Sequence, residues 1–109
     1  MIDLVAQKKQ ELIKLCRSFQ VERLDLFGSA ADGSFQSESS DLDFIVSFGH
    51  PAPGTYLNLY LDFAEALERL FERPVDVLTE KSIRNPYFRR SIELTRQPLY
   101  ERPNEEAAA

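Results

Sequence analysis

Apolar residues recur along this chain with two different spacings. In residues 5–19, 56–70 and 85–94 they return at every third or fourth position, which predicts three amphipathic helices. Residues 21–27, 42–48 and 75–78 are short apolar-rich runs bounded by glycine, proline or polar residues, which predicts three strands. The helical stripes consist of Leu12, Leu15, Cys16 and Phe19, then Tyr56, Tyr60, Phe63, Ala64, Leu67 and Leu70, then Tyr87, Phe88, Ile92 and Leu94.

The order of these elements indicates the fold class. A short helical turn is expected after Gly28, so the order is helix, strand, short helix, strand, helix, strand, helix (αβαβαβα). Helices that alternate with three strands predict an α+β protein with a small β-sheet covered by helices mainly on one face. Thr55 is placed to cap the second long helix. We expect one domain over residues 1–102 and a flexible tail over residues 103–109.

Composition excludes several classes of protein. The chain has 109 residues and one cysteine, Cys16, which lies on an apolar helical stripe and is expected to be a buried small hydrophobe, so a disulfide framework is excluded. No apolar run approaches the roughly 20 residues that span a bilayer, and the start of the chain lacks a signal-peptide pattern, so we expect a cytoplasmic protein without membrane contact. The net charge of −5 argues against direct nucleic-acid binding.

Two short segments carry residue types suited to phosphate chemistry. The first strand ends at Gly28, and Ser29 follows in a turn where backbone N–H groups can bind phosphate; a plain strand-to-helix turn with a serine cap is the alternative. Asp41 and Asp43 stand at the entrance of the second strand. Because side chains alternate along a strand, both point to the same side, with Cα atoms roughly 6.5–7 Å apart, a spacing that suits shared divalent ions. An Asx turn is the alternative.

A third carboxylate, Asp76, lies between two valines in the third predicted strand. Alone, it is explained by an edge strand that points the side chain at solvent. Beside Asp41 and Asp43 on a neighbouring strand, it predicts three carboxylates that converge on one place. Such a cluster repels itself unless cations are bound, and two divalent ions remove the repulsion. The pattern therefore indicates metal-dependent chemistry on a nucleoside triphosphate.

These residues, read together, resemble a known family. The segments Phe27-Gly28-Ser29 and Ser40-Asp41-Leu42-Asp43, with Asp76 downstream, are similar to the minimal nucleotidyltransferase (MNT) branch of the DNA polymerase β-like superfamily, and the resemblance covers nearly the whole chain. It implies a mixed-sheet nucleotidyltransferase fold, two Mg²⁺ ions and ATP as the substrate. It also implies that Asp41, Asp43 and Asp76 are catalytic metal ligands and that Gly28 and Ser29 bind the nucleotide.

The resemblance extends to partners. Many members resemble antitoxins that pair with HEPN-domain ribonuclease toxins, and some adenylylate a toxin tyrosine, which implies transfer of AMP to a hydroxyl of a HEPN-type partner. A non-catalytic antitoxin that acts by contact alone is the alternative. Two departures from the family favour it: the segment from Ala30 to Ser40 is one residue longer than usual, and Asp32 replaces an arginine. A third hypothesis is a nucleotidyltransferase that modifies a small molecule. It is less favoured, because such enzymes usually need an additional domain to hold the acceptor and this chain is too short to contain one.

Two surfaces could bind partners. Arg84, Arg89 and Arg90 lie near the last helix and could contact phosphates or an acidic partner; a solvated basic face is the alternative. Leu57 and Leu61 lie off the main stripe of the second long helix and could form a homo-oligomer or partner surface; core packing is the alternative.

Overall fold

The computed structural model describes residues 3–28, 31 and 41–102. The predicted tail lies outside this part of the chain, and so does most of the segment expected to form a helical turn after Gly28. No helix in the described ranges combines the length and the apolar character needed to cross a bilayer. The elements are α1 (Asp3–Gln7), α2 (Lys9–Ser18), β1 (Val21–Phe27), β2 (Leu42–Phe48), α4 (Tyr56–Phe71), β3 (Val75–Thr79), the 3-10 helix η1 (Glu80–Ser82), α5 (Pro86–Thr95) and β4 (Gln97–Glu101).

The sheet is mixed and has four strands in the order β3-β2-β1-β4. β2 pairs with β3 in parallel, while β1 pairs with both β2 and β4 in antiparallel orientation. The α+β class and the mixed sheet are confirmed, but the prediction of three strands was one too few. The missed strand is β4, which contains Pro98. Proline lacks a backbone donor, and it is tolerated here because β4 is an edge strand.

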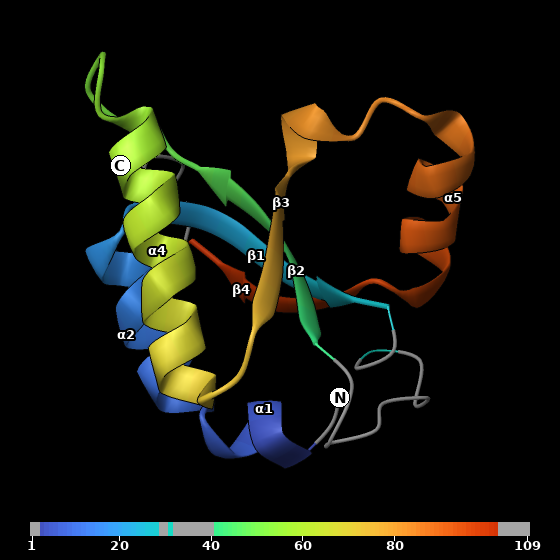
Figure 1. Cartoon of the computed structure of the whole chain (residues 1–109), viewed down its shortest axis with the longest axis horizontal. Helices are drawn as coiled ribbons and strands as arrows, with labels where there is room; N and C mark the ends of the chain where they lie inside the picture. Colours follow the sequence, from blue (N-terminus) through green and yellow to red (C-terminus); the bar gives the residue numbers. More distant parts are fainter. Residues whose placement is uncertain (1–2, 29–30, 32–40, 103–109) are drawn as a thin grey trace, which may run out of the picture.

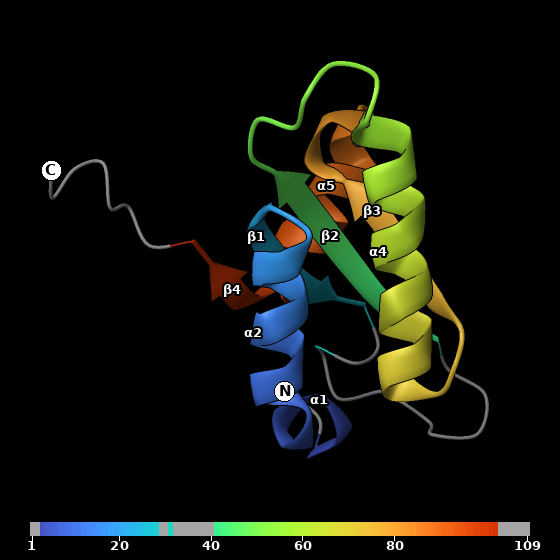
Figure 2. The same cartoon turned by 90° about the vertical axis from the view of Figure 1, so that its left-hand side faces the viewer.

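Helices cover both faces of the sheet unequally. α2 and α4 lie together on one face, and α5 lies on the other (Figure 1). The same arrangement is visible in the turned view, where α2 and α4 stand in front of the strands (Figure 2). The larger core lies under α2 and α4 and takes alternate β2 residues Leu42, Phe44, Val46 and Phe48, whereas Ile45 belongs to the smaller core under α5 with Phe27, Ile83 and Ile92. Asp43 therefore lies on the α5 face of the sheet.

Local expectations for the helices were met in part. Cys16 is fully buried, as predicted, and burial raises the pKa of its thiol to about 12. The first predicted helix is interrupted at Lys8 and forms two shorter helices. Thr55 is the N-cap residue of α4, as predicted, but its side chain makes no capping hydrogen bond, because its hydroxyl donates to the backbone oxygen of Ala52, 2.6 Å away. At α5 the side chain of Asn85 supplies an N-cap.

The outer edge of β3 carries side-chain hydrogen bonds. The hydroxyl of Tyr60 donates to the backbone oxygen of Val77 at 2.6 Å, and the hydroxyl of Ser82 donates to that of Thr79 at 2.8 Å. These carbonyls belong to alternate residues and so face the same edge, away from β2. The two side chains thereby occupy acceptors that an unprotected edge strand would leave open.

Candidate active site

Asp43 and Asp76 are neighbours in the sheet. The two residues are register partners on the adjacent parallel strands β2 and β3, so their side chains leave the sheet on the same face. Asp76 lies on an edge strand and its side chain is exposed, as expected if it simply points at solvent. Asp43 is only partly exposed. Asp41 is exposed and lies two residues before Asp43, just ahead of β2. The fold thus places the predicted carboxylates at one end of these two strands.

The charges of these side chains act on one another. Burial, and then the nearby carboxylates of Asp76 and Asp41, raise the pKa of Asp43 from 3.8 to about 6. A raised carboxyl pKa means that the folded protein disfavours the ionised form of this group. A positive charge at this place would reverse that preference.

Gly28 lies directly against Asp43. The residue ends β1 with a backbone φ of +71°, which side-chain-bearing residues rarely adopt. A Cβ atom built on Gly28 would lie 2.5 Å from the Oδ2 atom of Asp43. Glycine is therefore required here on two grounds, the left-handed turn and the space beside the carboxylate.

The backbone N–H of Gly28 is not available to a phosphate. It donates to the Oγ1 atom of Thr95, at the end of α5, over 3.2 Å. The expectation that the turn presents open N–H groups is therefore corrected at this residue. Ser29, the other predicted nucleotide-binding residue, lies outside the described residues, as does Asp32.

The carboxylates fit a divalent cation in chemical type. Oxygen ligands are those Mg²⁺ prefers, and the raised pKa of Asp43 reflects negative charge that a cation would offset. Within residues 3–28, 31 and 41–102, however, no three histidine, cysteine, aspartate or glutamate side chains are grouped closely enough to hold one metal ion. Asp43 and Asp76 are brought together by the strand register; convergence of all three aspartates stays a prediction.

Behind the site lies a buried ion-pair network that the sequence analysis missed. Asp25 on β1 is fully buried and pairs with Arg96, whose side chain is 9% exposed. Arg96 also pairs with Glu80 of η1 and Glu93 of α5. Burial alone would lower the pKa of Arg96, but its hydrogen bonds to Glu80, Asp25 and Glu93 outweigh burial and hold it above its usual value. The network fastens α5 and η1 to the sheet.

The cluster of arginines near α5 separates into two kinds. Arg89 donates to the carboxylate and backbone oxygen of Glu80 and to the backbone oxygen of Ile83, so it is a structural residue. The hydrogen bond from Arg96, and then that from Arg89, lower the pKa of Glu80. The suggestion that Arg89 contacts phosphate or a partner is therefore not supported. Arg84 and Arg90 are exposed. Their exposure is compatible both with contact to phosphates or an acidic partner and with a solvated basic face.

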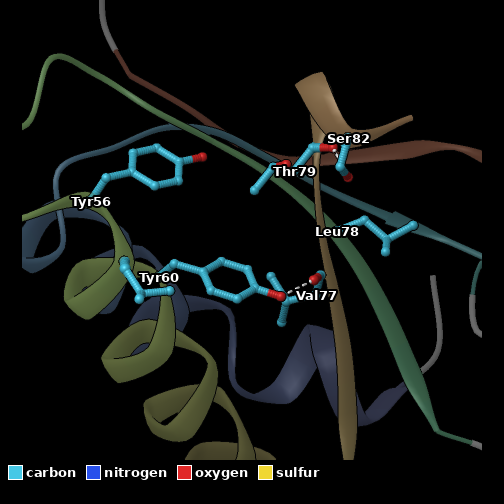
Figure 3. Close-up of a pocket in the computed structure, with 7 residues that line it drawn as sticks. Tyr56, Tyr60, Val77, Leu78, Thr79 and Ser82 are labelled. Atoms are coloured by element: carbon cyan, nitrogen blue, oxygen red, sulfur yellow. Dashed lines mark hydrogen bonds between the residues drawn. The ribbon is translucent and has the colours of Figure 1, made fainter. Parts of the chain in front are cut away.

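A cavity of about 290 Å³ lies elsewhere, between α4 and β3. Tyr56 and Tyr60 extend into it from α4 toward β3 (Figure 3). None of the predicted site aspartates lines it. Nearby, Leu57 is 65% exposed and Leu61 is 51% exposed, so core packing does not explain these two leucines.

Comparison with known proteins agrees with this geometry. The family model described as "Nucleotidyltransferase domain" matches residues 9–99. "Putative protein adenylyltransferase MJ1379" of Methanocaldococcus jannaschii is 37% identical over 89 residues, which cover 82% of this chain and 85% of that protein. "Putative protein adenylyltransferase MJ0126" of the same organism is 33% identical over 91 residues, covering 84% and 86%.

Solved structures share the fold. One described as "putative minimal nucleotidyltransferase" has a TM-score of 0.71 and 29% identity, covering 89% of this chain and 96% of its own. A chain from the complex of tri-AMPylated Shewanella oneidensis HEPN toxin with MNT antitoxin has a TM-score of 0.60 and 17% identity, covering 94% and 77%. The second likeness concerns the fold alone. The chain belongs to the nucleotidyltransferase domain family, as its glycine turn and strand aspartates predict.

Proposed function

We propose that residues 1–102 form a single Mg²⁺-dependent adenylyltransferase domain that transfers AMP from ATP to a hydroxyl of a partner protein in the cytoplasm. The partner would be a HEPN-type toxin, and this protein its antitoxin. The observation that carries the proposal is the placement of Gly28, Asp43 and Asp76 at one end of adjacent strands. Relatives named as protein adenylyltransferases support a protein acceptor, and a solved neighbour that holds an AMPylated HEPN toxin supports the choice of partner.

Each site residue has a proposed role. Asp41, Asp43 and Asp76 would hold two Mg²⁺ ions, and these ions would supply positive charge beside the triphosphate. Gly28 would let the nucleotide approach the backbone closely, and its lack of a side chain also leaves room for the carboxylate of Asp43, which a Cβ atom would approach to 2.5 Å. Ser29 would bind the β- or γ-phosphate.

The reaction is an in-line displacement. The acceptor oxygen forms a bond to the α-phosphorus of ATP while the bond from that phosphorus to the bridging oxygen breaks, and pyrophosphate leaves. The hydroxyl proton passes to a carboxylate, for which Asp76 is suited because its side chain is exposed to an incoming acceptor.

Labelled ATP tests the proposal. The protein is incubated with ATP labelled at the α-phosphate, Mg²⁺ and its co-purifying partner, and the polypeptides are separated. Label on the partner, dependent on Mg²⁺, is the expected result. A stable complex that stays unlabelled, under conditions where ATP binds, would instead establish the contact antitoxin.

Binding of Mg²⁺ is expected to weaken in acid. The metal-free pKa of Asp43 is about 6, and a metal ion binds the ionised carboxylate in competition with the proton. Affinity for Mg²⁺ should therefore rise with pH and level off above this pKa, and at about pH 5 it should be about tenfold weaker than at about pH 7.5. Calorimetric titration at both pH values measures the difference. Equal affinities would contradict the assignment of Asp43 as a ligand.

A further inference from the structure

The end of α5 and the start of β4 hold both described ends of the segment Gly28–Ala31. Thr95 lies 67 residues after Gly28 in the chain, and its Oγ1 atom accepts the N–H of that glycine over 3.2 Å. Two residues further, the Nε2 atom of Gln97 donates to the backbone oxygen of Ala31 at 3.1 Å. Ser29 lies in sequence between these two anchored residues.

The hydroxyl of Thr95 is itself oriented. It donates to the backbone oxygen of Ile92, one turn earlier in α5, over 3.3 Å. Because a hydroxyl has one proton and that proton is directed to the helix, an oxygen lone pair is left to accept from Gly28. A serine would preserve both interactions, and a valine of nearly the same shape would remove both.

A buried ion pair ties the segment that carries these two residues to the sheet. Arg96 stands between Thr95 and Gln97 and pairs with the fully buried Asp25, three residues before Gly28. The strand that leads into the turn and the segment that anchors the turn are thereby joined by a buried ion pair.

We infer that Thr95 and Gln97 are positioning residues for nucleotide binding: they hold Gly28 and Ala31, the two described residues that flank the predicted nucleotide-binding Ser29 in the sequence. The inference rests on the proposed function. Neither residue touches the nucleotide in this scheme; each acts through the turn. The consequence should appear mainly in affinity for ATP and less in the rate of transfer from bound ATP.

The test compares Thr95→Val with Thr95→Ser. Binding of the non-hydrolysable analogue AMP-PNP in Mg²⁺ is measured by calorimetry, and KM for ATP and kcat are measured with the partner. Loss of a partly buried hydrogen bond that leaves a donor unpaired predicts an affinity about tenfold weaker for Thr95→Val, with a matching rise in KM. Thr95→Ser should stay within about twofold of the wild type. Gln97→Met should weaken binding in the same direction.

Thr55→Val is the matched control. It removes a hydroxyl that also bonds a backbone oxygen, but at an exposed place ahead of α4, and its ATP affinity should equal that of the wild type. Equal affinity of Thr95→Val and the wild type would overturn the inference while leaving the proposed function standing. So would an equal loss in Thr95→Val and Thr95→Ser. Absence of nucleotide binding by the wild type would overturn the proposed function itself, and the inference with it.

Discussion

Asp43→Asn is expected to lower Mg²⁺-dependent transfer from ATP by at least about a thousandfold, since loss of a shared metal ligand removes several kcal/mol of transition-state stabilisation. The same change should leave the metal-free fold as stable as the wild type or slightly more stable. This follows from the pKa of Asp43, which is raised to about 6 by burial and by the charges of Asp76 and Asp41, so the ionised carboxylate is disfavoured in the folded state near neutral pH. Transfer assays and urea unfolding measure the two effects.

The opposite directions of activity and stability make this variant informative. Mg²⁺ should raise the unfolding midpoint of the wild type and have little effect on Asp43→Asn, because only the wild type gains a ligand-stabilised state. Asp62→Asn, an exposed change on α4 away from the site, is the matched control and should resemble the wild type in each measurement. Undiminished transfer by Asp43→Asn would remove Asp43 from the active site.

Arg96→Met is expected to destabilise the fold by about 3 kcal/mol, since removing one partner of a buried pair leaves an uncompensated charge. The charge in question is that of Asp25, which is fully buried. Arg23 also contacts Asp25, at 3.0 Å, and should keep the loss at the lower end of the range for buried pairs. Urea unfolding followed by circular dichroism measures the free energy of unfolding.

Two further variants distinguish the effect of burial on the free energy of unfolding from the effect of losing an ion pair. Arg69→Met removes the same side chain from an exposed pair with Glu65 and should cost less than about 1 kcal/mol. The double change Asp25→Leu with Arg96→Met replaces the buried pair by apolar side chains and should recover most of the lost stability. An equal loss in Arg96→Met and Arg69→Met would contradict the role given to the network.

β1, β2 and β3 were predictable because the apolar residues of each strand form a short run that is bounded by glycine, proline or polar residues. The predicted bounds of β1 and β2 agree with the structure at every residue, and β3 differs by its last residue. β4 was missed because Pro98 argues against a strand unless one knows that the segment lies at an edge. Knowing this requires the order of strands, which apolar spacing does not contain.

The candidate site was predictable to the extent that it depends on neighbouring positions in strands. Side-chain alternation put Asp41 and Asp43 on one side of a strand, and the hypothesis that Asp76 lies on a neighbouring strand is confirmed by the register of β2 and β3. The contacts that support them were not predictable, because they join residues such as Gly28 and Thr95 that lie far apart in the chain. Nothing in the sequence distinguishes Arg96 and Asp25 from other charged residues. Their ion pair becomes apparent only in the folded structure.

The hydrogen bonds along β3 limit how this protein can assemble. With the carbonyls of Val77 and Thr79 taken by Tyr60 and Ser82, a foreign strand would have to displace side chains before it could extend the sheet on that side. Templated growth into intermolecular sheets is therefore disfavoured at this edge, which lies next to the exposed Asp76. We expect a partner that approaches the candidate active site from here to contact side chains, such as the exposed Leu57 and Leu61, and not to pair with the backbone of β3.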